Sequence, residues 1–246
     1  MGSTSGRPVV IKLGGAALPH RDAVLRDLAA AREAGFQPIL VHGGGPVISE
    51  WLKRIGKQPT FVDGLRVTDA ETLEVATMAL AGKVNKELVA TLNLAGTPAV
   101  GLAGADGGWI RARRITEPDL GFVGEVVSVD PTPALALIAA GYLPVVAPIA
   151  LGDEGLLNIN ADTVAGDIAR AVGAAILIFL TDVPGVKDAS GQVAAHLTAG
   201  QVQAMREDGT IAGGMIPKVQ ACLRAAEVGA RAVIADGGDP GAIGIH

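Results

Sequence analysis

Short apolar runs alternate with segments of helical spacing along most of this chain. The runs predict strands at residues 9–13, 38–41, 99–102, 143–147, 174–180 and 232–235. Apolar positions at helical spacing predict helices at residues 21–33, 46–55, 71–94, 134–140, 163–172 and 215–228. Continuously apolar strands separated by helices are typical of a parallel sheet covered on both faces. We therefore expect an α/β protein built as a three-layer αβα sandwich with a mainly parallel central sheet.

The middle of the chain has a different pattern. Residues 109–114 and 123–129 alternate between apolar and polar positions, so they predict antiparallel strands beside the main sheet. A weak boundary near residues 153–157 divides an N-terminal lobe, about residues 1–155, from a C-terminal lobe, about residues 156–246. We expect both lobes to belong to one domain of residues 1–246, because no linker of low complexity separates them.

Composition narrows the class of protein. The chain has 246 residues, of which 49% are apolar and 18% charged, and its net charge is −5. These values exclude disorder for most of the chain and argue against a nucleic-acid-binding surface. No apolar run reaches the roughly 18 residues of a membrane span, and the first six residues lack the apolar core of a signal peptide. We expect a cytoplasmic protein whose single cysteine, Cys222, is a core residue rather than a nucleophile.

Two lysines and one aspartate carry the strongest chemical signal. Lys12 stands just before Gly14 and Gly15 near the end of a predicted strand, Lys218 closes another glycine-framed segment, and Asp162 lies between them in the sequence. A strand that ends in Lys-x-Gly-Gly offers a positive charge and bare backbone N–H groups at one point. Phosphoryl transfer needs that combination, because its transition state is mostly displaced negative charge. The chain has neither a Walker loop nor a dinucleotide-binding G-x-G-x-x-G after a strand.

Three consecutive glycines join a predicted strand to a predicted helix in His42-Gly43-Gly44-Gly45-Pro46. They reach backbone angles closed to other residues, and their N–H groups can converge on an anion at the positive end of the helix dipole. The alternative is a tight turn without a ligand. We favour the anion site.

Arg66 precedes the predicted helix at residues 71–94. Its guanidinium can make a two-pronged contact with a carboxylate, although a lone arginine in a loop is more often a solvated surface charge. Either Thr68 or Asp69 can cap the helix that follows.

Asn158, Asn160 and Asp162 alternate just before another predicted helix. An extended stretch would point all three side chains the same way, whereas helix capping would explain one of them. Residues 181–186 end a predicted strand at the carboxyl edge of the sheet, where ligands gather in open α/β folds. This segment is equally consistent with a plain turn and with the rim of a nucleotide site.

Six segments together resemble the amino acid kinase family over nearly the whole chain, and in particular its branch that phosphorylates N-acetyl-L-glutamate. They are residues 11–15, 42–45, 64–68, 158–162, 181–185 and 214–218. The resemblance implies ATP-dependent phosphorylation of the side-chain carboxylate, giving N-acetylglutamyl 5-phosphate for arginine biosynthesis, with Mg²⁺ accompanying the nucleotide. It also implies that the N-terminal lobe holds the substrate and the C-terminal lobe holds ATP.

The resemblance assigns roles to individual residues. Lys12 and Lys218 would hold the transferring phosphoryl group, and Asp162 would orient both lysines. The substrate would be bound by Gly44, Gly45, Arg66, Asn158 and Asn160, with Arg66 and Asn158 on its α-carboxylate. The nucleotide would be bound by Gly14, Gly15, Thr181, Asp182, Val183, Gly185, Val186, Gly209, Thr210 and Ile211. No side chain is expected to ligate a metal directly.

Two alternatives stay open. An aminoadipate-type kinase of lysine biosynthesis would phosphorylate the same group on a longer or carrier-bound substrate. A non-catalytic sensor of amino acids or nucleotides would use the same fold, although it would not need to keep Lys12, Asp162 and Lys218. Family members inhibited by arginine carry an extra N-terminal helix, whereas residues 1–8 alone precede the first predicted strand here. The resemblance therefore implies an arginine-insensitive homodimer.

Overall fold

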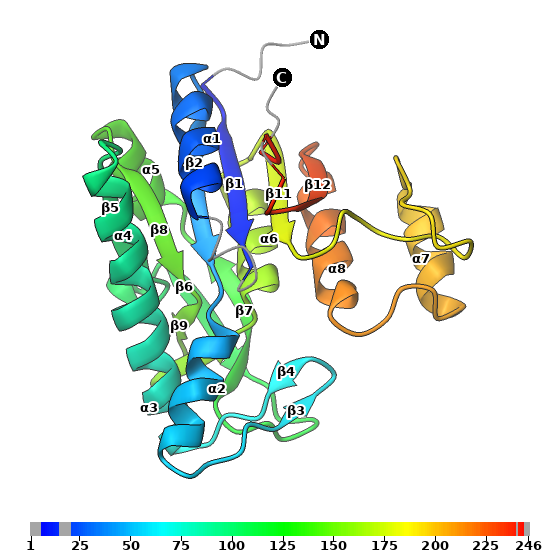
Figure 1. Ribbon diagram of the computed structural model, residues 1–246. Coiled ribbons are helices and arrows are strands. Elements are labelled where there is room, and N and C mark those ends of the chain that lie inside the picture. The colour runs from blue at the N-terminus through cyan, green and yellow to red at the C-terminus, as the bar shows by residue number, and fades with distance from the viewer. Residues whose placement is uncertain (1–5, 15–20, 240, 244–246) are drawn as a thin grey trace.

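The computed structural model describes residues 6–14, 21–239 and 241–243, and a six-stranded sheet runs through its centre (Figure 1). The strands follow the order β12-β11-β1-β2-β8-β5, and every neighbouring pair is parallel. They are β1 (Pro8–Leu13), β2 (Gln37–His42), β5 (Ala99–Ala103), β8 (Leu143–Ala147), β11 (Ile176–Thr181) and β12 (Arg231–Asp236). All six strands were predicted, because each is a short apolar run between helices.

Helices cover both faces of this sheet (Figure 1). They are α1 (Arg21–Glu33), α4 (Asn85–Leu94), α5 (Thr132–Ala139), α6 (Ala161–Ala171) and α8 (Met215–Ala226). Val9 and Ile11 of β1 share a buried cluster with residues of α1 and α4, whereas Val10 shares another with residues of α6 and α8. Successive strand residues point to opposite faces, so a continuously apolar strand needs a helix on each side. The predicted αβα sandwich is confirmed.

A smaller four-stranded sheet closes on itself beside the main one. Its strands are β6 (Ile110–Arg114), β7 (Val123–Val129), β9 (Ile149–Leu151) and β10 (Leu156–Ile159). β6 and β7 are antiparallel, as their alternation predicted. β9 and β10 were not predicted, because three and four residues are too few to show a period. The turn between them, where Gly152 N–H donates to the Gly155 carbonyl at 2.7 Å, lies at the predicted lobe boundary.

The predicted helix at residues 71–94 is a composite of three segments. It consists of α3 (Ala70–Thr77), a π-helical segment (Met78–Val84) and α4. Asp69 caps its beginning, because its Oδ1 accepts a hydrogen bond from Thr72 N–H at 2.9 Å. The π-helical segment was not predicted, because apolar spacing does not distinguish it from an α-helix. Among the described residues, no helix has the length and apolar character that crossing a membrane requires.

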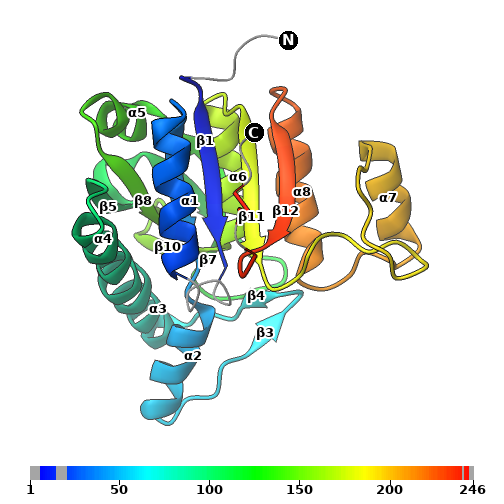
Figure 2. The same cartoon turned by 45° about the horizontal axis from the view of Figure 1, so that its top comes forward.

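Three further elements complete the fold. Helix α2 (Gly45–Arg54) was predicted, whereas the hairpin of β3 (Phe61–Val62) and β4 (Leu65–Arg66) was not. Helix α7 (Ala199–Glu207), also not predicted, lies on the outer side of α8, away from the main sheet (Figure 2). Thr198 and Gln201 form a capping box at its start, which is a signal that a sequence search can use.

Candidate active site

The carboxyl ends of neighbouring strands bring several predicted site residues to one edge of the central sheet. Lys12 is the second-last residue of β1, and it pairs in register with Val41 of β2 and Phe179 of β11. The last residues of β2 and β11 are His42 and Thr181. Open α/β sheets bind ligands at this edge, because the loops that leave the strands are free to surround a ligand there.

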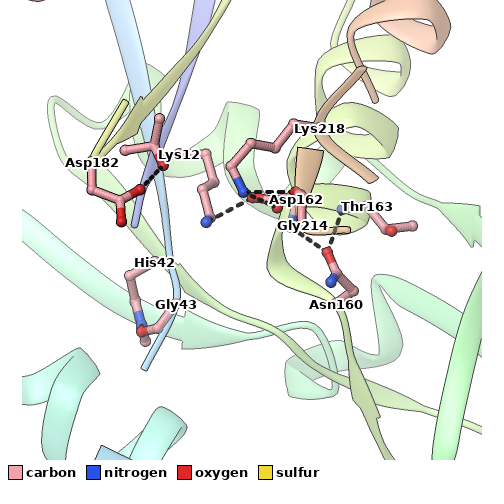
Figure 3. A network of polar contacts seen from close by, with 10 residues as sticks. Lys12, His42, Gly43, Asn160, Asp162, Thr163, Asp182, Gly214 and Lys218 are labelled. Atoms are coloured by element: carbon pink, nitrogen blue, oxygen red, sulfur yellow. Dashed lines mark hydrogen bonds and ion pairs between the residues drawn. The ribbon is translucent and has the colours of Figure 1, made fainter. Parts of the chain in front are cut away.

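Asp162 lies between the two lysines at this edge (Figure 3). Its Oδ1 is 2.7 Å from Lys12 Nζ, and its Oδ2 accepts a hydrogen bond from Lys218 Nζ at 2.9 Å. Asp162 is 5% exposed and Lys12 is 7% exposed, so the contacts are largely removed from water. The structure thus brings together one residue each from β1, α6 and α8, the three that were predicted to be catalytic.

Burial and charge act in opposite directions on these groups. Burial raises the pKa of Asp162, but the charges of Lys12 and Lys218 outweigh it and hold that pKa below its ordinary value. Burial lowers the pKa of Lys12, and the Asp162 carboxylate opposes that change. The Asp182 carboxylate also opposes it. Each ammonium group attracts an anion more strongly here than it would in water, because the local dielectric constant is lower.

A close contact between α6 and α8 sets the position of Lys218. Gly166 lies one turn after Asp162 on α6 and faces Ala221 on α8. A Cβ atom added to Gly166 would lie 2.7 Å from the Ala221 Cβ and 2.8 Å from its Cα. Lys218 and Ala221 are three residues apart and share one face of α8. The contact at Gly166 therefore determines how closely Lys218 approaches Asp162.

The three glycines after β2 form the entrance to α2. Gly44 is the N-cap residue and Gly45 is the first helical residue. Their two N–H groups have no hydrogen-bond acceptor among the described residues, and they lie where the helix dipole is positive. Gly43 N–H donates to the Leu13 carbonyl at 3.0 Å, which ties the loop to the end of β1 beside Lys12. The loop is thus built to receive an anion next to the lysines.

A cavity of about 160 Å³ opens beside this loop. Its lining includes Gly44, Gly45, Phe61, Arg66, Asn158 and Asn160. A larger hollow of about 850 Å³ lies elsewhere, around β6, β7 and the turn between β9 and β10, and holds none of the predicted site residues. The smaller cavity is the candidate substrate site, because it adjoins the loop and is lined by all five residues that were predicted to bind substrate.

Arg66 carries donors that the protein does not fully use. Its Nη2 donates to the Gly45 carbonyl and to Ser49 Oγ, both at 2.9 Å. Its guanidinium lies over the Phe61 ring, 4.6 Å from the ring centroid. Its Nη1 is buried without a hydrogen-bond partner among the described residues. A buried charged donor without an acceptor is costly, so Arg66 is suited to an anionic ligand rather than to a solvated surface role.

The prediction that Asn158, Asn160 and Asp162 share one extended stretch is wrong. Helix α6 begins one residue before Asp162, and Asn160 is its N-cap residue. Asn160 Oδ1 accepts hydrogen bonds from Asp162 N–H at 2.8 Å and Thr163 N–H at 3.2 Å, as Figure 3 shows. Asn158 belongs to β10, where its Nδ2 donates to Thr68 Oγ1 at 3.1 Å. Asn158 and Asn160 line the cavity, whereas Asp162 contacts the lysines.

The predicted nucleotide residues fall into separate groups. Thr181 Oγ1 donates to Asp182 Oδ1 at 3.0 Å at the end of β11, and Figure 3 shows Asp182 near Lys12. Gly14 N–H donates to the Leu180 carbonyl at 2.8 Å, so in this conformation it is not a free donor. Gly15 lies outside the described residues.

The remaining members of that set lie on the side of α7 and α8. Val186 and Ile211 are buried in one small apolar cluster with Val202 and Val219. Val183 and Gly185 lie in the loop after β11, and Gly209 and Thr210 lie in the loop after α7. The cluster brings the two loops side by side, and its own side chains serve packing.

Comparison with known proteins identifies the family. The model of the amino acid kinase family matches residues 7–236. The chain belongs to the amino acid kinase family. The acetylglutamate kinase of Acidiphilium cryptum is 49% identical over 96% of this chain and 85% of that protein. The acetylglutamate kinase of Symbiobacterium thermophilum is 50% identical over 96% of this chain and 86% of that protein.

Solved structures have a similar fold. The crystal structure of smu.665 from Streptococcus mutans has a TM-score of 0.84 at 29% identity and covers 93% of this chain and 94% of that one. A carbamate kinase structure from Giardia has a TM-score of 0.72 at 15% identity, covering 94% of this chain and 93% of that one. The second similarity concerns the fold alone.

Two residues that contact Arg66 in this amino acid kinase were missed by the sequence analysis. Ser49 accepts a hydrogen bond from Arg66, and Phe61 stacks on the same guanidinium although it is 52% exposed. Ser49 follows Gly45 by one helical turn, a spacing that places it above the loop and that the sequence does reveal. Phe61 offers no comparable signal, because the β3–β4 hairpin that turns it onto Arg66 was not predicted.

Proposed function

We propose that this amino acid kinase transfers the γ-phosphoryl group of ATP to the side-chain carboxylate of N-acetyl-L-glutamate, giving N-acetylglutamyl 5-phosphate for arginine biosynthesis. The curated relatives with this activity in their names align over nearly the whole chain. The geometric observation that carries the proposal is the contact of Lys12 and Lys218 with the single carboxylate of Asp162. This cluster lies at the sheet edge next to the loop of residues 43–45 and a small cavity.

The chemistry needs charge rather than a base. A glutamate-type side chain has a pKa of about 4.3 and is already ionised near neutrality, so the nucleophile carries its own negative charge. The difficulty is to bring two anions together in line. Lys12 and Lys218 neutralise the transferring phosphoryl group, and Asp162 favours the charged form of Lys12 and orients both ammonium groups. His42 is not required as a base, and burial lowers its pKa to about 4.

The residues that line the cavity would bind the substrate. Arg66 would place its unpaired Nη1 on the α-carboxylate, with Asn158 beside it, while Asn160 lines the same space. The N–H groups of Gly44 and Gly45, at the positive end of the α2 dipole, would face the reacting carboxylate and the phosphoryl group. Arg66 thus binds a group distant from the reaction, whereas the lysines act on the group that moves.

We assign the nucleotide to the C-terminal lobe, about residues 156–246, and the substrate to the N-terminal lobe, about residues 1–155. Residues 181–186 and 209–211 would lie along ATP, and Gly14 and Gly15 would lie near its phosphates. Within the described residues, no group of three or more His, Cys, Asp or Glu side chains is placed to hold a metal ion. We therefore expect Mg²⁺ to accompany the nucleotide and to neutralise its phosphate oxygens. We further propose a cytoplasmic homodimer.

ADP release tests the proposal directly. Purified protein is supplied with saturating ATP and Mg²⁺ and with either N-acetyl-L-glutamate or L-2-aminoadipate derivatives. We expect release that depends on N-acetyl-L-glutamate and a much higher kcat/KM for it. A preference for the aminoadipate-type substrate would change the substrate but keep the mechanism. No release with any acceptor, together with tight nucleotide binding, would favour a sensor.

A further inference from the structure

A buried polar cluster lies directly behind the glycine loop. His42, the last residue of β2, is 0% exposed. Its Nδ1 contacts the Gly43 carbonyl at 2.8 Å, and its Nε2 contacts Asn85 Nδ2 at 3.1 Å. A carbonyl oxygen can only accept a hydrogen bond and an amide nitrogen can only donate one. Both contacts are therefore satisfied by one neutral tautomer, with the proton on Nδ1 and none on Nε2.

Asn85 holds the imidazole from the other side. It is also 0% exposed, and its Nδ2 donates a second hydrogen bond to the Val145 carbonyl of β8 at 2.9 Å. Its Oδ1 accepts from Lys86 Nζ at 3.0 Å. A Cβ atom on Gly101 would lie 1.9 Å from that Oδ1, so the sheet leaves room for this amide by having glycine there. Every polar atom of the Asn85 side chain thus has a partner.

The π-helical segment brings Asn85 to this place and also supports the loop. The segment ends at Val84, directly before Asn85. A Cβ atom on Gly44 would lie 2.6 Å from Leu80 Cδ2 and 3.3 Å from Val84 Cγ2, so the segment packs against the back of Gly44. A π-helical turn inside an α-helix frequently marks a functional site. Here it faces the loop that is proposed to contact the phosphoryl group.

We propose that His42 and Asn85 are positioning residues that fix the direction of the loop amides. The Gly43 carbonyl and the Gly44 N–H belong to one planar peptide unit and point in opposite directions. The hydrogen bond from His42 to that carbonyl therefore fixes where the Gly44 N–H points. Glycine on both sides would otherwise let this peptide unit rotate easily. The proposal rests on the proposed function, because it gives these amides the transferring phosphoryl group as their target.

Two substitutions of His42 separate this role from a purely structural one. In His42→Asn, the side-chain amide nitrogen takes the place of Nδ1 and keeps a donor for the Gly43 carbonyl. In His42→Gln, the longer side chain reaches the place of Nε2, so it keeps an acceptor for Asn85 and loses the donor. Each variant loses one hydrogen bond, so a structural role predicts similar activity. We expect kcat to fall at least about tenfold in His42→Gln and less than about threefold in His42→Asn, with KM changed little.

A second pair of substitutions replaces two asparagines of helix α4. Asn85→Ala removes the donor to His42, whereas Asn93→Ala removes an amide that joins α4 to β5 through Ala99, away from the loop. We expect kcat to fall about tenfold or more in Asn85→Ala and to stay within about twofold of the parent value in Asn93→Ala. Melting temperatures are measured for all four variants, so that loss of folded protein is not counted as loss of kcat.

Equal kcat values in the two His42 variants would overturn the proposal. So would an Asn93→Ala variant that loses as much kcat as Asn85→Ala. If the variants do not fold, ¹⁵N NMR of the imidazole nitrogens in the unmutated protein decides. We expect a protonated Nδ1 and a bare Nε2 for His42 at neutral pH, and the opposite tautomer would refute the geometry. Failure of the proposed function is distinct, because it would appear as absent ADP release in the unmutated protein.

Discussion

Gly166→Ala should separate the lysines by moving one helix. The added methyl group would lie 2.7 Å from the Ala221 Cβ, 2.8 Å from its Cα and 3.1 Å from its carbonyl oxygen. Carbon atoms in contact need about 3.5–4.0 Å, so α8 must move away by about 1 Å. Overpacking of this kind typically costs about 1–3 kcal/mol of unfolding free energy. Lys218 moves with α8, and its 2.9 Å hydrogen bond to Asp162 lengthens accordingly.

The same displacement should also lower the rate of phosphoryl transfer. A displacement of about 1 Å at a catalytic group can cost about a hundredfold in rate, so we expect kcat to fall by that order. The KM for N-acetyl-L-glutamate should change less than about threefold, since the residues that line its cavity come from elements other than the displaced helix α8. Steady-state kinetics at a temperature where the variant is folded, with unfolding followed in denaturant, measures both quantities.

Gly200→Ala provides the matched control. Gly200 is also helical, in α7, and a Cβ atom there would meet nothing within 4 Å. Alanine is favoured over glycine in helices by up to about 1 kcal/mol, so this variant should be as stable as the parent protein or more stable, with unchanged kcat. A folded Gly166→Ala variant that keeps kcat within threefold of the parent value would refute the argument that this helix contact positions Lys218.

Further predictions concern charge and pH. Lys218→Ala should lower kcat by about a hundredfold with little change in KM. Arg66→Ala should mainly raise the KM for N-acetyl-L-glutamate. Small and equal effects of the two substitutions in steady-state kinetics would contradict both roles. Burial lowers the pKa of His42 from 6.5 to about 4, so between these pH values the unfolded chain binds the proton that the folded protein excludes. Unfolding free energy should therefore fall by about 3 kcal/mol as pH drops through this window, and denaturant titrations of His42→Asn should show a smaller fall.

Much of the fold was predictable because its strands are buried on both faces. A strand such as β1 is apolar nearly throughout, and Lys12 stands out in it. The elements that were missed are those whose stability comes from tertiary contacts. β9 and β10 are too short for a period, and each strand of the β3–β4 hairpin has only two residues. The π-helical segment has the same apolar spacing as its neighbours.

The candidate site was predictable in its members but not in its arrangement. The resemblance named Lys12, Asp162 and Lys218, yet their contact depends on the approach of α6 to α8 at Gly166, which no motif encodes. Conversely, the alternation of Asn158 and Asn160 suggested one shared direction, but a helix begins between Asn160 and Asp162 and turns the aspartate toward the lysines. Local spacing therefore identified candidates, and helix packing decided which of them meet.

The burial of this cluster explains why an aspartate lies between the two lysines that we propose to be catalytic. Two ammonium groups with little access to water would repel each other, and burial already lowers the pKa of Lys12. Without a nearby carboxylate, this repulsion would be relieved most readily if Lys12 lost a proton. The positive charge that the proposed reaction requires would then be absent. Asp162 opposes that loss while the substrate site is empty. Asp162 therefore favours the charged form of Lys12, which would act on the phosphoryl group when that group arrives.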